Sequence, residues 1–147
     1  MREPYQILSI PYRVVDGKPL FCIFRRADSS YWQFIAGGGE NKETPKEAAK
    51  REIFEETGVK ADSVIQLTSV ACIPAEVIAE EKRKHWNKST IVIPEYSFAF
   101  ECNEEPRISN EHTEYKWLPY DEARKVLKWD SNKVAMYEID SIIKRKL

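Results

Sequence analysis

Three glutamates close together in the chain have the side-chain type and spacing for metal or proton chemistry. Glu52, Glu55 and Glu56 lie in the stretch REIFEE, and at about 100° per residue a helix places all three on one arc. Like charges this close repel each other, so we expect a positive partner, either Arg51 with nearby lysines or a divalent cation. Carboxylate oxygens favour Mg²⁺ or Mn²⁺ over soft metals. A solvated acidic face balanced by basic neighbours is the alternative interpretation.

The helix that must position these glutamates has both of its ends marked in the sequence. Thr44 and Glu47 form a capping-box pattern, Pro45 suits the first helical position, and Gly58 is typical of a helix stop. We predict that the apolar side of this helix faces the core through Ala48, Ala49, Ile53 and Phe54.

A run of glycines lies just upstream of the helix. Gly37, Gly38 and Gly39 follow Ala36, and we predict a loop there that breaks the strand pattern. A glycine loop lets the backbone approach a ligand closely. Such a loop alone is weak evidence for a binding site. Together with a capped helix and a glutamate cluster beside it, it is much stronger evidence.

The remaining elements predict an α/β domain with a mixed sheet. Apolar and β-branched runs predict strands at residues 7–15, 20–25, 64–73, 90–102 and 115–118, and the turn residues 16–19 favour a hairpin between the first two. Residues 31–35 form a short aromatic run. Helices are predicted from residue 121 to 127 and from 131 to 146, the second with Val134, Ala135, Ile139, Ile142 and Ile143 inward. Residues 75–89 are compatible with a polar helix or a long loop. Strands interleaved with helices and hairpins favour a mixed sheet.

Composition limits the class of protein. The chain has 147 residues, 42% of them hydrophobic, with 23 basic and 24 acidic side chains. This apolar fraction excludes a disordered chain, and the absence of a basic excess argues against binding to nucleic acid or to a membrane. Cys22, Cys72 and Cys102 are expected to be buried, reduced thiols. We expect one domain over residues 1–147, without a signal peptide and in the cytoplasm.

The glycine, arginine and glutamate positions together resemble a known family. Gly37-x5-Glu43-x7-Arg51-Glu52-Ile53-x-Glu55-Glu56-x-Gly58-Val59 matches every fixed position of the 23-residue box of the Nudix hydrolases. The resemblance implies an α/β/α sandwich around a mixed sheet, with the box as a loop-helix-loop. It also implies Mg²⁺-dependent hydrolysis, with Mn²⁺ as a substitute, of a nucleoside diphosphate linked to another group.

Residues outside the box are similar to the dihydroneopterin triphosphate or dATP pyrophosphohydrolase branch. The similar segments are Phe24-Arg25-Arg26, Tyr31-Trp32-Gln33-Phe34, Glu111-His112, Tyr115-Lys116-Trp117-Leu118 and Trp129-Asp130-Ser131-Asn132. This similarity implies cleavage of a nucleoside or pterin triphosphate to the monophosphate and pyrophosphate. A nucleotide sugar or dinucleoside polyphosphate is the alternative substrate, and a nucleotide-sensing module without turnover is a further one. The chain departs from the family at Ala36 and at Glu40-Asn41-Lys42, which affects loop shape and substrate fit.

The resemblance also implies roles for the acidic residues. Glu55 and Glu56 correspond to the main metal ligands, Glu52 joins them directly or through water, and the backbone carbonyl of Ala36 is a further ligand. Arg51 orients the glutamates, together with Glu43. The general base is Glu52 or Glu55 within the box, or Glu111 outside it, where relatives use a loop glutamate as base or metal ligand.

Substrate contacts follow from the same comparison and from side-chain chemistry. Arg25 or Arg26 is expected to hold phosphate oxygens with its planar guanidinium, and Gly37 and Gly38 to contact substrate. Asn132 is a candidate contact to the ring edge. Aromatic side chains that either stack on the ring or belong to the core are Trp32, Phe34 and Tyr96.

Two histidines and the partners complete the expectations. His85 and Trp86 belong to a substrate lid, a basic patch or a solvated loop, with the loop favoured, and His112 is expected to be structural. The expected partner is a small nucleotide or pterin polyphosphate, with no nucleic acid and no membrane. Either a monomer or a homodimer is compatible with the sequence.

Overall fold

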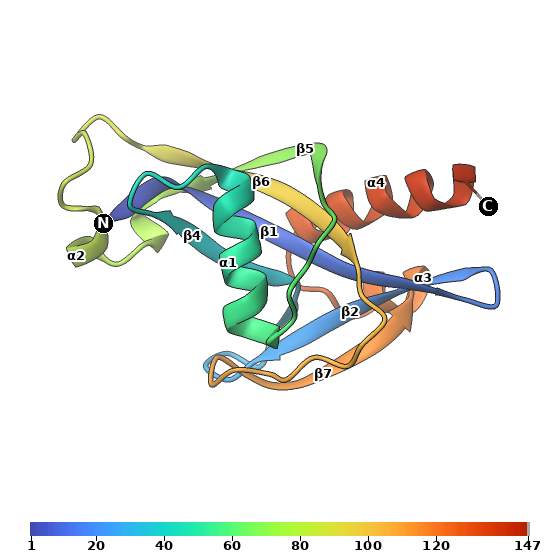
Figure 1. The fold of residues 1–147 in the computed structure, drawn as a ribbon. Coiled ribbons are helices and arrows are strands. Elements are labelled where there is room, and N and C mark those ends of the chain that lie inside the picture. Colours follow the sequence, from blue (N-terminus) through green and yellow to red (C-terminus); the bar gives the residue numbers. More distant parts are fainter. Residues whose placement is uncertain (147) are drawn as a thin grey trace.

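A mixed sheet of seven strands forms the centre of the computed structural model, which describes residues 1–146 (Figure 1). The strands are β1 (Arg2–Val15), β2 (Lys18–Arg26), β3 (Trp32–Gln33), β4 (Ile35–Glu40), β5 (Val64–Pro74), β6 (Val92–Glu101) and β7 (His112–Pro119). The helices are α1 (Pro45–Thr57), α2 (Glu80–Arg83), α3 (Tyr120–Val126) and α4 (Asp130–Lys146), with a 3₁₀ turn at Ala75–Val77. The predicted α/β class with a mixed sheet is confirmed.

Strand β1 organises the sheet because it has three neighbours. It forms the predicted hairpin with β2 through a turn at Asp16 and Gly17, whose φ angles of 52° and 76° suit a tight hairpin. It runs antiparallel to β4 and parallel to β6, while β5 extends the sheet beyond β6 and β7 pairs with β2. The strand begins at Arg2 rather than at the predicted residue 7, since its first residues pair with β4.

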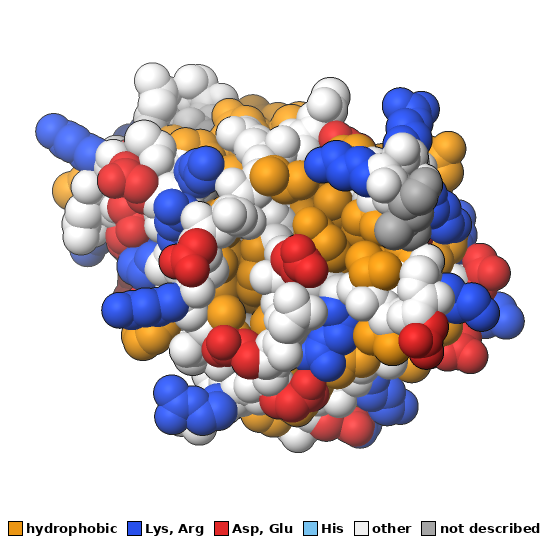
Figure 2. All heavy atoms as spheres, turned by 45° about the vertical axis from the view of Figure 1, so that its right-hand side comes forward, with side chains coloured by type: hydrophobic (Ala, Val, Ile, Leu, Met, Phe, Trp, Pro, Cys, Tyr) orange, Lys and Arg blue, Asp and Glu red, His pale blue; other side chains and the backbone are white. Residues whose placement is uncertain are grey.

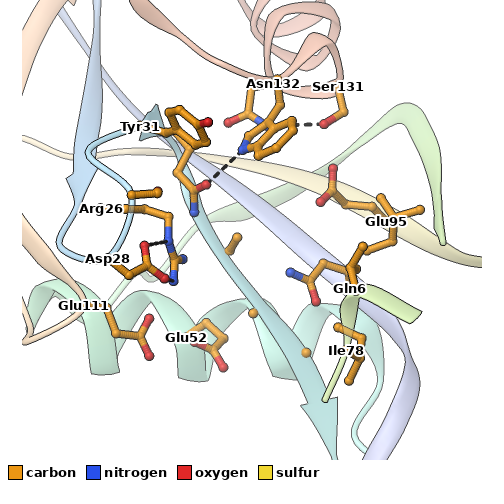
Figure 3. A pocket seen from close by; sticks show the side chains of 18 of the residues that line it. Gln6, Arg26, Asp28, Tyr31, Glu52, Ile78, Glu95, Glu111, Ser131 and Asn132 are labelled. Carbon is orange, nitrogen blue, oxygen red and sulfur yellow. Dashed lines mark hydrogen bonds and ion pairs between the residues drawn. The ribbon is translucent and has the colours of Figure 1, made fainter. Parts of the chain in front are cut away.

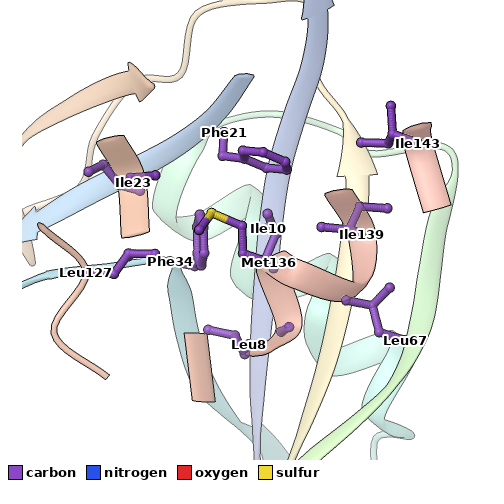
Figure 4. Packing of buried hydrophobic residues seen from close by; sticks show 13 residues of the cluster. Leu8, Ile10, Phe21, Ile23, Phe34, Leu67, Leu127, Met136, Ile139 and Ile143 are labelled. Carbon is purple, nitrogen blue, oxygen red and sulfur yellow. The ribbon is translucent and has the colours of Figure 1, made fainter. Parts of the chain in front are cut away.

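Helices cover both faces of the sheet. On one face α1 packs on a cluster that includes Ile7, Phe24, Ile35 and Phe98. On the other, α3 and α4 cover the cluster drawn in Figure 4, whose members include Leu8, Phe21, Phe34, Met136 and Ile139. The result is the α/β/α sandwich that the family resemblance implied.

The ends of α1 are those predicted, but one of its side chains faces the other way. Thr44 Oγ1 accepts from the Glu47 amide at 3.2 Å, the Glu47 carboxylate accepts from the Thr44 amide at 2.9 Å, and Gly58 ends the helix in the left-handed conformation. Phe54, predicted to face the core, is 50% exposed, because Ile53 and the two alanines already fill the buried side.

Other predicted core positions also prove exposed. Val134 is 58% exposed, because α4 buries the face that carries Ala135, Met136, Ile139 and Ile143 instead. Cys72 is exposed near the end of the edge strand β5, whereas Cys22 and Cys102 are buried as expected.

The segment 75–89 contains a 3₁₀ turn and the single-turn helix α2 rather than one helix or an open loop. Trp86 is buried against Ala75 and Ile93, and both Trp86 Nε1 and His85 Nε2 lie within hydrogen-bond distance of the Arg2 carbonyl oxygen, at 2.8 and 2.7 Å. The favoured interpretation of a solvated loop is therefore wrong for Trp86. This segment fixes the start of β1 in place.

The surface carries charges of both signs. Figure 2 shows acidic and basic side chains interspersed over one face, with apolar atoms between them and no block of a single sign. None of the helices within residues 1–146 has the length and apolar character needed to cross a membrane.

Candidate active site

Arg51 lies at the centre of a cluster of acceptors on α1 and the segment before it. Its Nε and Nη2 donate to the two oxygens of Glu43 at 2.8 and 2.9 Å, and Nη2 also donates to the Gly38 carbonyl at 2.8 Å. Its Nη1 donates to Glu52 at 3.0 Å and to Glu55 at 3.1 Å. The guanidinium of Arg51 thus links Glu52 and Glu55 to Gly38 on strand β4, which we call the glycine strand.

Glu52 is the most buried carboxylate that faces this cluster, with its side chain 13% exposed. Burial raises its pKa to about 7, although the neighbouring Arg51 works against this shift. A group that holds its proton near neutral pH can act as a base or bind a cation only after the proton leaves. Glu52 is therefore poised for proton exchange close to physiological pH.

The glycine run is a strand and not the predicted loop, and its lack of side chains makes room for Glu52. Gly37 and Gly38 pair with β1 as part of β4. A Cβ added at Gly37 would lie 2.2 Å from Glu52 Cδ, and one at Gly38 would lie 1.8 Å from Arg2 Cζ. The ends of the Glu52 and Arg2 side chains therefore pack directly on the glycine backbone, and a Cβ at either position would displace them.

Glu56 faces a different set of partners. It is 4% exposed, accepts from Ser109 Oγ at 2.8 Å and lies 3.0 Å from His112 Nδ1. Burial opposes its ionisation, but His112 and Ser109 outweigh that effect and lower the pKa of Glu56. Partial burial and the nearby Glu56 raise the pKa of Glu111. The loop glutamate expected from the resemblance thus lies beside a box glutamate.

A cavity of about 770 Å³ opens next to Glu52 (Figure 3). The sequence-predicted residues that line it are Arg26, Ala36, Gly37, Gly38, Glu52, Glu111 and Asn132. Among them, Arg26 is held by both oxygens of Asp28 at 2.9 Å. The buried Asn132 uses its Oδ1 to accept from the Phe34 amide at 2.9 Å, so this oxygen is committed to the fold.

Several candidate contacts lie elsewhere. Arg25 pairs with Glu114 on β7 at 3.2 Å, and Trp32 packs against the cluster under α4, with Lys116 over its ring. Phe34 is fully buried and Tyr96 packs beside the other cluster, so the core interpretation of these rings is correct. None of the four lines the cavity. Successive side chains on a strand point to opposite faces of the sheet, so Arg25 and Arg26 face different ways. Which of the two faces the cavity depends on how the strands pair.

Sequence reasoning missed other residues that line the cavity. Tyr31 and Trp129 contact each other edge to face, with ring centres 5.9 Å apart, and both line the cavity. Gln6 and Glu95 line it from adjacent strands. Trp129 was part of a family-like segment, but neither Gln6 nor Glu95 had a local signal in the sequence.

The donor set is suited to a hard cation, although it is not assembled as a closed metal site. Within residues 1–146 no three His, Cys, Asp or Glu side chains converge closely enough to hold a metal ion. Carboxylates outnumber cations in the cluster, since Glu43, Glu52 and Glu55 share Arg51. A crowded, partly buried set of carboxylate oxygens matches the preference of Mg²⁺.

Comparison with known proteins agrees with this geometry. The family model of the NUDIX domain matches residues 11–138. The chain is 28% identical over 138 residues to the dihydroneopterin triphosphate diphosphatase of Escherichia coli K12, covering 92% of this chain and 91% of that protein. It is 38% identical to a protein from Listeria monocytogenes whose crystal structure is described as that of a NUDIX hydrolase, with a TM-score of 0.86 and coverage of 98% and 97%.

A shorter match extends the range of relatives. The chain is 38% identical over 72 residues to an RNA pyrophosphohydrolase of Cereibacter sphaeroides, covering 44% of each protein.

The chain belongs to the Nudix family and is a hydrolase that acts on phosphorus-containing anhydrides. Members of this family generally use divalent metal ions.

Proposed function

We propose that the protein is a Mg²⁺-dependent pyrophosphohydrolase that converts a nucleoside or pterin triphosphate to the monophosphate and pyrophosphate. The observation that carries this proposal is the position of Glu52, buried on the glycine strand at the wall of the cavity, with its pKa raised toward neutrality. The similarity to a dihydroneopterin triphosphate diphosphatase, over 92% of this chain and 91% of that protein, supports this type of substrate.

Each residue of the cluster has a part in this proposal. Glu52, Glu55, Glu56 and Glu111, with the Ala36 carbonyl, would hold the divalent cation, which neutralises charge on the polyphosphate and polarises water when bound. Arg51 holds Glu52 and Glu55 in place and is itself oriented by Glu43. Arg51 is therefore a positioning residue.

The hydrolysis itself needs a base, a nucleophile and a leaving group. A water oxygen attacks phosphorus, the phosphoanhydride P–O bond breaks, and pyrophosphate leaves with the electron pair of that bond. Glu52 or Glu111 accepts the water proton, since both face the cavity and the pKa of each is raised. Glu55 remains a candidate base as well. Arg26, which lines the same cavity, binds phosphate oxygens, and the backbone at Gly37 and Gly38 lines the cavity as well.

The test is a substrate panel with separate detection of phosphate and pyrophosphate. Dihydroneopterin triphosphate, dATP, dGTP, a nucleotide sugar, a dinucleoside polyphosphate and 5′-triphosphorylated RNA are incubated with the protein and Mg²⁺, and with EDTA. We expect pyrophosphate from a small triphosphate only when Mg²⁺ is present. Turnover confined to the sugar, the dinucleotide or the RNA would replace the proposed substrate class, and turnover in EDTA would remove the metal from the mechanism.

A further inference from the structure

Glu95 is a further acidic group in the cavity, and the hydrolytic steps above do not use it. It lies on β6, is 7% exposed and lines the cavity. Within residues 1–146 its Oε1 has no hydrogen-bond partner. A buried carboxylate oxygen without a donor is unfavourable, and such atoms are rare in folded proteins. An N–H donor supplied by a ligand would satisfy it.

Gln6 lies directly beside Glu95 and offers the complementary group. The two residues are register partners on the parallel strands β1 and β6, and both line the cavity, as Figure 3 shows. Gln6 Oε1 accepts from Arg2 Nη2 at 2.6 Å. Because arginine only donates, this bond fixes the orientation of the amide. Gln6 Nε2 then remains a donor without an acceptor among residues 1–146.

The two side chains therefore present a donor beside an acceptor at the same end of the cavity. Adjacent strands lie about 4.8 Å apart, which is comparable with the width of one heteroaromatic ring. The carboxylate can accept two N–H groups, and the amide can donate to one carbonyl oxygen. This arrangement matches a ring edge with one acceptor followed by two donors.

We propose that Gln6 and Glu95 bind the edge of a 2-amino-4-oxo ring, the edge that guanine and the pterins share, within the triphosphate substrate of the proposed function. The amide of Gln6 donates to the ring carbonyl, and the ring N–H and the exocyclic amino group donate to Glu95. Adenine has one amino group beside a ring nitrogen without hydrogen, so it leaves a carboxylate oxygen unpaired. Uracil and thymine place a second carbonyl against the carboxylate, which is repulsive.

The surroundings of Glu95 favour a bound ring of this kind. Burial raises the pKa of Glu95, and the neighbouring Ser131 hydroxyl opposes that shift. Two N–H donors from the ligand would stabilise the charged form further. Trp129 lines the same cavity with its ring fixed by a bond from Nε1 to Gln33 Oε1 at 3.1 Å, and it offers an aromatic surface for the ring.

Binding of ring compounds without metal tests this proposal separately from hydrolysis. Guanosine, neopterin and adenosine are titrated into the protein in EDTA by calorimetry, at concentrations up to the millimolar range. We expect guanosine or neopterin to bind at least about 10-fold more tightly than adenosine, and the stronger of the two identifies the source of the ring. If no triphosphate were hydrolysed, the proposed function would fail, while these affinities would still report on the ring site.

Modified rings test the contact without changing the protein. In 1-methylguanosine a methyl group replaces the ring N–H, and inosine lacks the amino group. We expect both to bind more weakly than guanosine. Equal affinity of guanosine and 1-methylguanosine, a wild-type preference for adenosine, or no saturable binding of any of these rings would overturn the proposal.

Two matched variants locate the contact on Glu95. Glu95→Gln replaces one acceptor with a donor, and we expect it to weaken binding of the preferred ring by about 10- to 100-fold while adenosine changes little. Glu101→Gln, an exposed change on the same strand outside the cavity, should leave every affinity unchanged. A folded Glu95→Gln protein that kept the full preference would contradict the proposal.

Discussion

Arg51 and Glu43 form a two-point ion pair, in which Nε and Nη2 of the arginine reach separate carboxylate oxygens at 2.8 and 2.9 Å. Glu43 thereby acts on the site through Arg51, which in turn contacts Glu52 and Glu55. The hydrogen bonds that Arg51 donates to Glu43 raise the pKa of Arg51, so its charge is constant over any working pH. This chain of contacts orders the glutamates without occupying the cavity.

Replacing Arg51 should therefore reduce both activity and stability. Arg51→Met removes the common donor of three carboxylates and the Gly38 carbonyl, and we expect kcat to fall by about 10- to 100-fold. The free energy of unfolding should fall by about 1–3 kcal/mol, measured by urea denaturation. Arg51→Lys should have kcat and stability close to those of Arg51→Met, because an ammonium group cannot reach the same set of acceptors.

The control for Arg51 is its neighbour on the helix. Lys50 is exposed, so Lys50→Met should leave kcat and the urea midpoint nearly unchanged. An Arg51→Met protein with wild-type kcat would show that the guanidinium does not position the glutamates.

Glu55→Gln separates activity from stability. The Glu55 side chain is 52% exposed, so its loss should change the free energy of unfolding by less than about 0.5 kcal/mol. As a proposed metal ligand it should matter greatly for turnover, and we expect kcat to fall by at least about 100-fold with saturating Mg²⁺. Glu122→Gln, an exposed glutamate on α3, is the matched control. Similar activity in the two variants would remove Glu55 from the site.

Gly37→Ala tests whether activity depends on the close packing of the Glu52 carboxylate against Gly37. A Cβ there would lie 2.2 Å from Glu52 Cδ, so the carboxylate must move. We expect kcat to fall by about 100-fold or more, because an error of about 1 Å at a catalytic group can have that effect. Activity with the substrate identified by the panel, together with the thermal midpoint, gives the measurement.

Gly17→Ala is the control for the change of glycine to alanine. Gly17 lies in the β1–β2 turn at a φ of 76°, with no atom near the added Cβ. It should lower stability by about 1 kcal/mol and leave kcat intact. If Gly37→Ala behaved in the same way, the close approach to Glu52 would have no functional role.

The parts of this site that could be predicted from the sequence depend on local chemistry. The capping box, Gly58 and the spacing of Glu52, Glu55 and Glu56 are properties of one helix, and the structure shows the predicted helix ends. Local periodicity does not determine how wide the buried side is, which is why Phe54 was misplaced. The glycine run itself predicts a loop, and its pairing with β1 depends on residues far away in the chain.

The placement of Gln6 and Glu95 in the cavity was beyond prediction for the same reason. Gln6 and Glu95 become neighbours only through the parallel pairing of β1 with β6. Trp129 reaches the cavity only because α4 crosses that face of the sheet, where Trp129 meets Tyr31 and Gln33. Long-range pairing of this type leaves no local pattern, so the spacing of the glutamates on α1 was predictable and the placement of Gln6 beside Glu95 was not.

The raised pKa of Glu52 predicts a definite dependence of stability on pH in the metal-free protein. Its pKa is about 7 in the folded state and near 4.5 in the unfolded state, so the folded protein binds the extra proton between these values. Stability should then fall as the pH rises from about 4.5 through about 7. Each pKa unit corresponds to about 1.4 kcal/mol, so the loss attributable to Glu52 approaches about 3 kcal/mol.

Glu52→Gln should remove that loss, since the amide keeps the shape and has no proton to release. In EDTA, the variant should be about as stable as the wild type at pH 5 and more stable at pH 8, by urea denaturation at both pH values. Glu122→Gln should follow the wild type, which separates Glu52 from the other titrating groups. If stability depended on pH equally in Glu52→Gln and in the wild type, burial of Glu52 against Gly37 would not raise the pKa of Glu52. In that case Glu52 would lose its main support as the base, because its readiness to exchange a proton near neutral pH rests on the same burial.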